Sequence, residues 1–130
     1  FNNYEAEFET NKTSLLKEYF INKIGNIPNI KITGSFSHRL PNHISFILFN
    51  KKFLPIKAYK VINYMSDNYV AISSGSACSS SSGKPSGILE IMGYDINQLN
   101  SNIRVSLGSM NKKSEIDRLL KLIQNCIKKF

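Results

Sequence analysis

The sequence has no tryptophan, little cysteine and no long apolar run. Its two cysteines, Cys78 and Cys126, are too few for the disulfide framework that staples small secreted domains, so we expect two free thiols. No apolar stretch approaches the roughly 18 residues of a membrane-spanning helix, and the first residues show no secretory pattern. We therefore expect a soluble protein of the cytoplasm that has no membrane partner.

Arginine is also scarce, although the chain carries a net charge of +8 and its pI is near 9.6. The positive charge comes mostly from lysines spread over all segments, and no basic run alternates with aromatic residues as a base-stacking surface would need. We therefore expect a solvated lysine surface and no nucleic-acid partner. His38 and His43 do not stand at metal-ligand spacing with each other or with the cysteines, so no metal site is expected.

The length and composition suit one core, since 42% of the 130 residues are hydrophobic. We expect a single domain over residues 1–130. Apolar residues recur at helical spacing from about residue 5 to residue 24, and Gly25 supplies a stop. A leading helix is therefore predicted within residues 1–25.

Three further helices are predicted. Proline suits the first helical turn, so Pro55 and Pro85 each mark a helix start, and the second of these helices ends at Gly93. The third lies near the C-terminus, where Ser114 and Asp117 resemble a capping box and an apolar stripe follows that includes Cys126 as a partly buried residue.

Short apolar or alternating segments predict the strands, at residues 30–34, 44–49, 70–72 and 103–107. Strands and helices mix without strict alternation. This pattern predicts an α+β fold of two layers, in which helices pack on one face of a small, largely antiparallel sheet.

One segment stands apart, the serine- and glycine-rich stretch at residues 73–86 that contains Cys78. Small polar residues offer no apolar side chain to fix the backbone, so a mobile cysteine loop is predicted. A cysteine in an exposed loop matters for what its thiolate can attack. On residue chemistry alone, an idle loop cysteine remains equally open.

Four ordered motifs carry a family resemblance: RLPNHISF at residues 39–46, the cysteine loop at 73–86, IRVSLG at 103–108 and EID at 115–117. From about residue 30 to the end, the chain resembles the C-terminal small domain of cysteine desulfurases, which are pyridoxal-phosphate enzymes of the class V aminotransferase group. The resemblance implies the small-domain fold of the fold-type I pyridoxal-phosphate enzymes. The long loop resembles the extended, mobile type found in that family.

The resemblance implies a role for Cys78. Its thiolate would take sulfur from L-cysteine, which leaves alanine and a persulfide on Cys78 for iron–sulfur cluster or thio-cofactor assembly. Ser76, Ala77, Ser79 and Ser80 would let the loop swing between the substrate and a sulfur-acceptor or scaffold protein.

Arg104 is the second site residue that the resemblance implies. Alternation places it on the opposite face from Ile103 and Val105, which by itself also suits a surface arginine or an ion pair at a sheet edge. In the family reading, its guanidinium holds the substrate carboxylate through two parallel hydrogen bonds.

The resemblance also implies what the chain lacks. In this family a larger domain keeps the cofactor-binding lysine and the groups that hold pyridoxal phosphate, so we expect no cofactor-binding residue here, an inactive isolated fragment, and a homodimer for the full-length enzyme. Two alternatives stay open: a related class V aminotransferase or lyase domain, and a stand-alone sulfur-carrier or interaction module.

Overall fold

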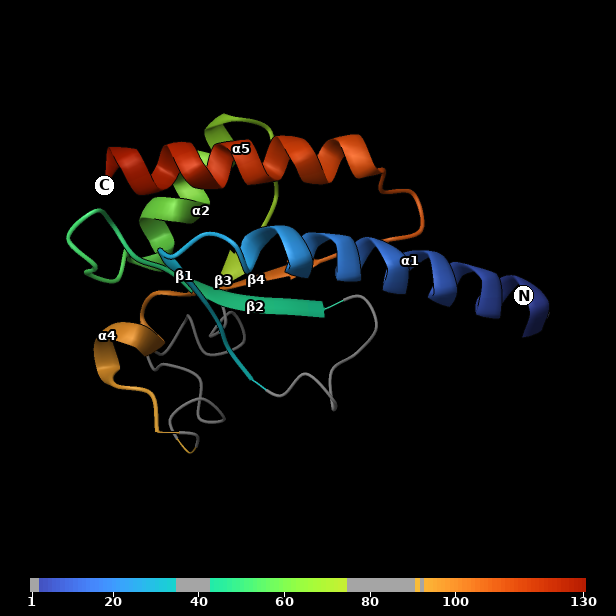
Figure 1. Cartoon of the computed structure of the whole chain (residues 1–130), viewed down its shortest axis with the longest axis horizontal. Helices are drawn as coiled ribbons and strands as arrows, with labels where there is room; N and C mark the ends of the chain where they lie inside the picture. The colour runs from blue at the N-terminus through green and yellow to red at the C-terminus, as the bar shows by residue number, and fades with distance from the viewer. Residues whose placement is uncertain (1–2, 35–42, 75–90, 92) are drawn as a thin grey trace.

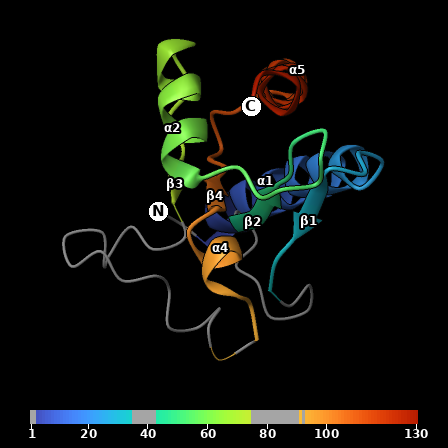
Figure 2. The same cartoon turned by 90° about the vertical axis from the view of Figure 1, so that its left-hand side faces the viewer.

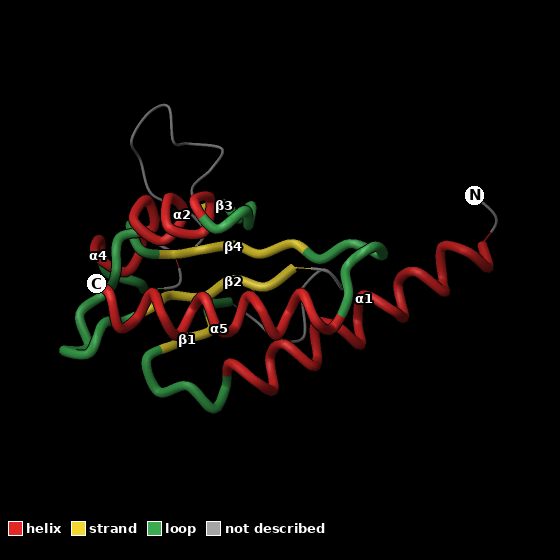
Figure 3. Tube along the Cα trace, turned by 90° about the horizontal axis from the view of Figure 1, so that it is seen from above, coloured by secondary structure: helices red, strands yellow, loops and turns green. Residues whose placement is uncertain are grey.

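The computed structural model describes residues 3–34, 43–74, 91 and 93–130 (Figure 1). The first element is α1 (Asn3–Ile24), whose first turns extend past the end of the sheet (Figure 3). The helix ends as predicted, and the Gly25 N–H closes its last turn on the carbonyl of Ile21 at 2.9 Å. A side chain at position 25 would approach that carbonyl to 3.2 Å, so glycine suits the position sterically.

Four strands form one sheet in the order β1-β2-β4-β3. All three pairings are antiparallel, and β2 and β4 are the central strands. Their bounds are β1 (Ile30–Ile32), β2 (His43–Leu48), β3 (Ser73–Ser74) and β4 (Asn102–Ser106).

Helix α1, α2 (Ala58–Asp67) and α5 (Lys113–Lys129) lie on one side of this sheet (Figures 1 and 2). The short α4 (Ile96–Leu99) lies on the other side and leads directly into β4. The predicted fold class, an antiparallel sheet with helices packed on one face, is confirmed.

The main core lies between the sheet and the three long helices. Each central strand contributes every second residue to it, and the helices contribute apolar stripes that meet this face. Among its fully buried side chains, Phe20 of α1 meets Phe46 of β2 edge to face, with ring centroids 6.0 Å apart. The other fully or nearly fully buried members are Ile24, Ile44, Leu48, Val61, Met65, Ile103, Ile116, Ile123 and Cys126.

Three local predictions are wrong. Helix α2 begins at Ala58, so Pro55 does not lie in its first turn and instead forms an isolated bridge with Phe49.

Residues 70–72 form no strand, and Ala71 is exposed. The strand follows directly after them, as β3 at Ser73 and Ser74. Tyr69 turns the chain out of α2 in a left-handed conformation (φ 62°). The chain therefore reaches β4 only at Ser73 and Ser74.

The predicted capping box at Ser114 and Asp117 is also displaced. Helix α5 begins at Lys113, and Glu115 accepts a hydrogen bond from the Lys112 backbone N–H at 3.0 Å. Glu115 therefore closes the first turn, because its carboxylate stands three residues after the N-cap position.

Candidate functional site

Arg104 lies in the middle of β4, the central strand that separates β2 from β3. Ile103 and Val105 on either side are buried in the main core, whereas Arg104 is half-buried on the opposite face. The predicted orientation of Arg104 is thus confirmed. Its guanidinium forms no hydrogen bond or ion pair with another residue in the part of the chain that the structure describes.

The neighbours of Arg104 across the sheet are serines. Ser45 of β2 and Ser73 of β3 are its direct partners in the two adjacent strands. Directly opposed residues of antiparallel strands share a face, so the three side chains form one polar row on the side away from the main core. The row consists of a cation between two hydroxyls.

Next to the row lies a buried polar cluster that the sequence reading missed. Asn102 Oδ1 accepts hydrogen bonds from Thr33 Oγ1 at 2.9 Å and from Ser45 Oγ at 3.0 Å, and the two hydroxyl oxygens are 2.6 Å apart. All three residues are almost fully buried. The cluster ties the end of β1 to β2 and β4, so it fixes the strand positions beside Arg104.

The predicted loop residues Ser76, Ala77, Cys78, Ser79 and Ser80 lie outside the described residues, as does the helix predicted after Pro85. The structure does show where the chain enters that segment. Strand β3 ends at Ser74, which is the partner of Ile103, the residue directly before Arg104. The cysteine segment therefore starts at the polar row.

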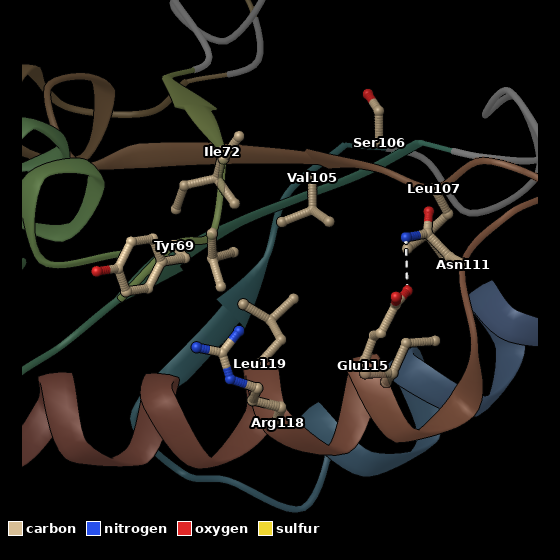
Figure 4. Close-up of a pocket in the computed structure, with 12 residues that line it drawn as sticks. Tyr69, Ile72, Val105, Ser106, Leu107, Asn111, Glu115, Arg118 and Leu119 are labelled. Carbon is tan, nitrogen blue, oxygen red and sulfur yellow. Dashed lines mark hydrogen bonds between the residues drawn. The ribbon is translucent and has the colours of Figure 1, made fainter. Parts of the chain in front are cut away.

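A groove of about 360 Å³ opens on the other side of β4, between β4, α5 and the connection from α2 to β3 (Figure 4). Its walls combine apolar and polar groups, with Val105 and Leu119 on opposite sides. Arg118 borders it, and its Nη2 already donates to the Asn68 carbonyl at 2.6 Å. Arg104 does not line this groove, so the groove and the polar row are separate features.

Hydrogen bonds close one end of the groove at the start of α5. Asn111 accepts from the Gly108 N–H at 2.7 Å and donates to Glu115 Oε2 at 2.9 Å (Figure 4). The Asn111 amide, followed by the Lys112 backbone N–H, lowers the pKa of Glu115. Glu115 is thus held as a structural anion at the helix start.

Cys126 was predicted to be partly buried; it is fully buried in the core and is free of any disulfide. Burial raises the pKa of its thiol to about 11. Because the thiolate is the reactive form, Cys126 is inert at neutral pH. Within the described residues, no group of three His, Cys, Asp or Glu side chains gathers as a metal site would require, and no described helix combines the length and apolarity needed to span a bilayer.

Comparison with known proteins identifies the family of this domain. The fold is that of a small α+β domain, and residues 1–119 match the family model of class-V aminotransferases. "Cysteine desulfurase IscS" of Dictyoglomus turgidum is 30% identical over 126 residues, which cover 96% of this chain and 31% of that protein. The protein of the same name from Proteus mirabilis is 33% identical over 123 residues, covering 95% and 29%.

A solved structure, the NifS-like protein from Rickettsia africae, shares the fold with a TM-score of 0.74 at 23% identity, over 91% of this chain and 29% of that one. The chain belongs to the class-V aminotransferase family. It spans about three-tenths of the length of the curated relatives that it matches.

The family depends in general on pyridoxal phosphate, which needs a pocket with a lysine amine inside it. The groove beside β4 has no lysine in its walls. A second hollow, beside the end of α5, has Lys60 and Lys129, but both amines lie over aromatic rings at the surface. Neither of these two hollows therefore fits the cofactor.

Proposed function

We propose that this chain is the C-terminal domain of a cysteine desulfurase, in which Arg104 holds the substrate carboxylate and Cys78 accepts the sulfur. The polar row carries the proposal. A half-buried guanidinium without a partner among the described side chains, set between Ser45 and Ser73, is suited to receive a carboxylate by two parallel hydrogen bonds.

Chain connectivity supports the pairing of Arg104 with Cys78. Cys78 follows Ser74 by four residues, and four residues of extended chain reach at most about 14 Å. The tether keeps the thiol near the polar row while allowing it to reach an acceptor. In the proposed reaction L-cysteine and the Cys78 thiol give alanine and a Cys78 persulfide, so the number of sulfur atoms and of electrons is the same on both sides.

The rest of the proposal concerns the longer protein. Pyridoxal phosphate is held by residues outside this fragment, L-cysteine is the substrate, and a sulfur-acceptor or scaffold protein takes the persulfide sulfur. The full-length enzyme works as a cytoplasmic homodimer, and the fragment, a single domain over residues 1–130, is inactive alone. The family relationship and the names of the relatives support the enzyme class, the cofactor and the substrate.

Substitutions in the full-length enzyme test the two roles. Cys78→Ser abolishes alanine and sulfide formation but leaves the spectroscopic titration of bound L-cysteine unchanged, because a hydroxyl does not attack sulfur as a thiolate does. Arg104→Ala weakens that titration at least about tenfold, and Arg104→Lys restores only part, since a point charge lacks the planar fork.

Arg118→Ala is the matched control, because Arg118 lies on α5 and its guanidinium bonds the Asn68 carbonyl instead of facing the row. We expect the Arg118→Ala enzyme to bind L-cysteine in this titration as the parent does. If Arg104→Ala also titrates like the parent, the carboxylate is bound elsewhere and the proposed role of Arg104 is wrong.

A further inference from the structure

The C-terminal end of α5 forms a surface of lysines and aromatic rings with α2. A shallow hollow of about 210 Å³ lies there, and Tyr64 and Phe130 meet in its wall edge to face with ring centroids 6.3 Å apart. Tyr59 stands beside them and is 62% exposed. The aromatic groups are therefore accessible at the surface instead of being enclosed in the core.

Two lysine amines lie over these rings. Lys129 Nζ is 5.3 Å from the centroid of Tyr64 and 5.5 Å from that of Phe130, and Lys60 Nζ is 5.8 Å from the Phe130 centroid. Such cation–π contacts hold a charged amine at a fixed place without neutralising it. Neither lysine pairs with a carboxylate of the described residues, so both charges remain available to a partner.

The turn after β2 lies beside the C-terminal end of α5 (Figure 1). Asn50 Nδ2 contacts the Phe130 carbonyl at 3.4 Å, and Asn50 Oδ1 accepts from the Lys52 and Leu54 backbone N–H groups. Between them Phe53 is held at a φ of 58° with 62% of its side chain exposed. The turn thus holds a second aromatic anchor out into solvent.

We define the lysine–aromatic patch as Phe53, Tyr59, Lys60, Tyr64, Lys129 and Phe130, and we propose that it binds an acidic polypeptide segment that carries aromatic or aliphatic side chains. Charge complementarity selects the occupant. The side chains of the patch carry only positive charge, and Asp67 is the single acidic side chain among the residues that line the hollow. Exposed rings are typical anchors of protein interfaces.

The same details argue against nucleic acid as the occupant. Base stacking needs free ring faces and is commonly aided by arginine. Here Lys60 and Lys129 lie over the Phe130 and Tyr64 rings, and the patch contains no arginine. The patch does not include any residue of the polar row. A test of binding at the patch is therefore independent of the desulfurase proposal.

Fluorescence anisotropy of the 130-residue chain with a short fluorescein-labelled peptide, rich in glutamate and containing spaced phenylalanines, tests the charge. We expect saturable binding that the double variant Lys60→Glu/Lys129→Glu weakens at least about tenfold. Lys113→Glu/Lys121→Glu is the matched control. It makes the same charge change with both lysines on α5, and Lys113 lies about 24 Å along that helix from Lys129.

A second matched pair tests the aromatic anchor. Phe53 and Tyr69 are both exposed aromatic residues with positive φ, a conformation that asparagine tolerates. Phe53→Asn weakens binding several-fold, while Tyr69→Asn does not. Circular dichroism establishes that each variant keeps its helices.

Three outcomes overturn the proposal. If both double variants lose peptide affinity equally, binding depends only on the net charge of the chain. Tighter, patch-dependent binding of a single-stranded oligonucleotide makes the surface a nucleic-acid site, and patch-dependent binding of vesicles rich in anionic lipid makes it a membrane contact.

Discussion

The two faces of the sheet are built from alternate residues of the same strands, yet they differ in polarity and in what covers them. On the helix side Ile44 and Phe46 of β2 meet Ile103 of β4 in a dry apolar layer. On the other side Ser45 faces Arg104, next to a buried amide that two hydroxyls satisfy. The helix-covered face therefore supplies the larger hydrophobic core, while the other face holds polar groups in fixed positions.

The largest expected effect is on the apolar face. Phe46→Ala removes a fully buried ring that packs against Phe20, and should lower the free energy of unfolding by about 3–5 kcal/mol. Urea denaturation followed by circular dichroism measures this. Leu15→Ala is the control, since Leu15 is 67% exposed and its loss should change stability by less than about 0.5 kcal/mol. A loss below about 1 kcal/mol for Phe46→Ala would contradict the assignment of the core.

The second effect concerns Cys126 on the apolar side. Its pKa is about 11 when folded and about 8.5 when unfolded, so the unfolded chain loses its thiol proton first as pH rises. The stability from burying a neutral thiol is complete below about pH 8.5 and is lost toward pH 11, by up to about 3 kcal/mol.

Urea midpoints across this range should fall more steeply for the parent than for Cys126→Ala. The comparison is necessary because the hydrogen bond to Asp117 also raises the pKa of Tyr19, which adds a slope in the same direction. Parallel slopes in the two proteins would mean that the thiol is solvated.

The third effect lies on the polar face. Asn102→Ala leaves the Thr33 and Ser45 hydroxyls without their common acceptor and should cost about 2 kcal/mol. The triple variant Thr33→Val/Ser45→Ala/Asn102→Leu should cost less than Asn102→Ala alone, because it leaves no buried polar group unsatisfied. Additive losses in urea denaturation would show that the three side chains act separately.

The smallest expected effect is at Arg104. Its guanidinium supports no other described side chain, so Arg104→Ala should change the free energy of unfolding by less than about 0.5 kcal/mol. The same substitution is expected to weaken substrate binding strongly in the full-length enzyme. A large loss of stability on urea denaturation would instead make Arg104 a structural residue.

The sequence predicted most of the apolar face, because helical spacing in α5 and alternation in β4 are local signals. The orientation of Arg104 followed from the same alternation. The start of α5 was misplaced by two residues, since Ser114 and Glu115 both carry side chains that suit helix starts and only the preceding turn at Gly108 and Asn111 decides between them.

The polar cluster could not be found in the same way. Thr33, Ser45 and Asn102 are far apart in the chain and meet only because β2 pairs with both β1 and β4. Strand order is a tertiary property, and no local pattern states it. A weak signal existed in Ser45, which interrupts the apolar segment 44–49 at a position where alternation leaves room for a polar residue, whereas Asn102 stands just before the predicted strand 103–107.

The packing of α5 has a consequence for how the chain is made on the ribosome. This helix ends at Lys129, yet Ile116, Ile123 and Cys126 fill the centre of the core, and its Asp117 accepts a hydrogen bond from Tyr19 of the first helix. During synthesis from the N-terminus, the sheet, α1 and α2 therefore emerge before the part of the apolar face that α5 fills is covered. Until the seventeen-residue α5 has left the exit tunnel, the nascent domain exposes apolar surface that is prone to aggregation.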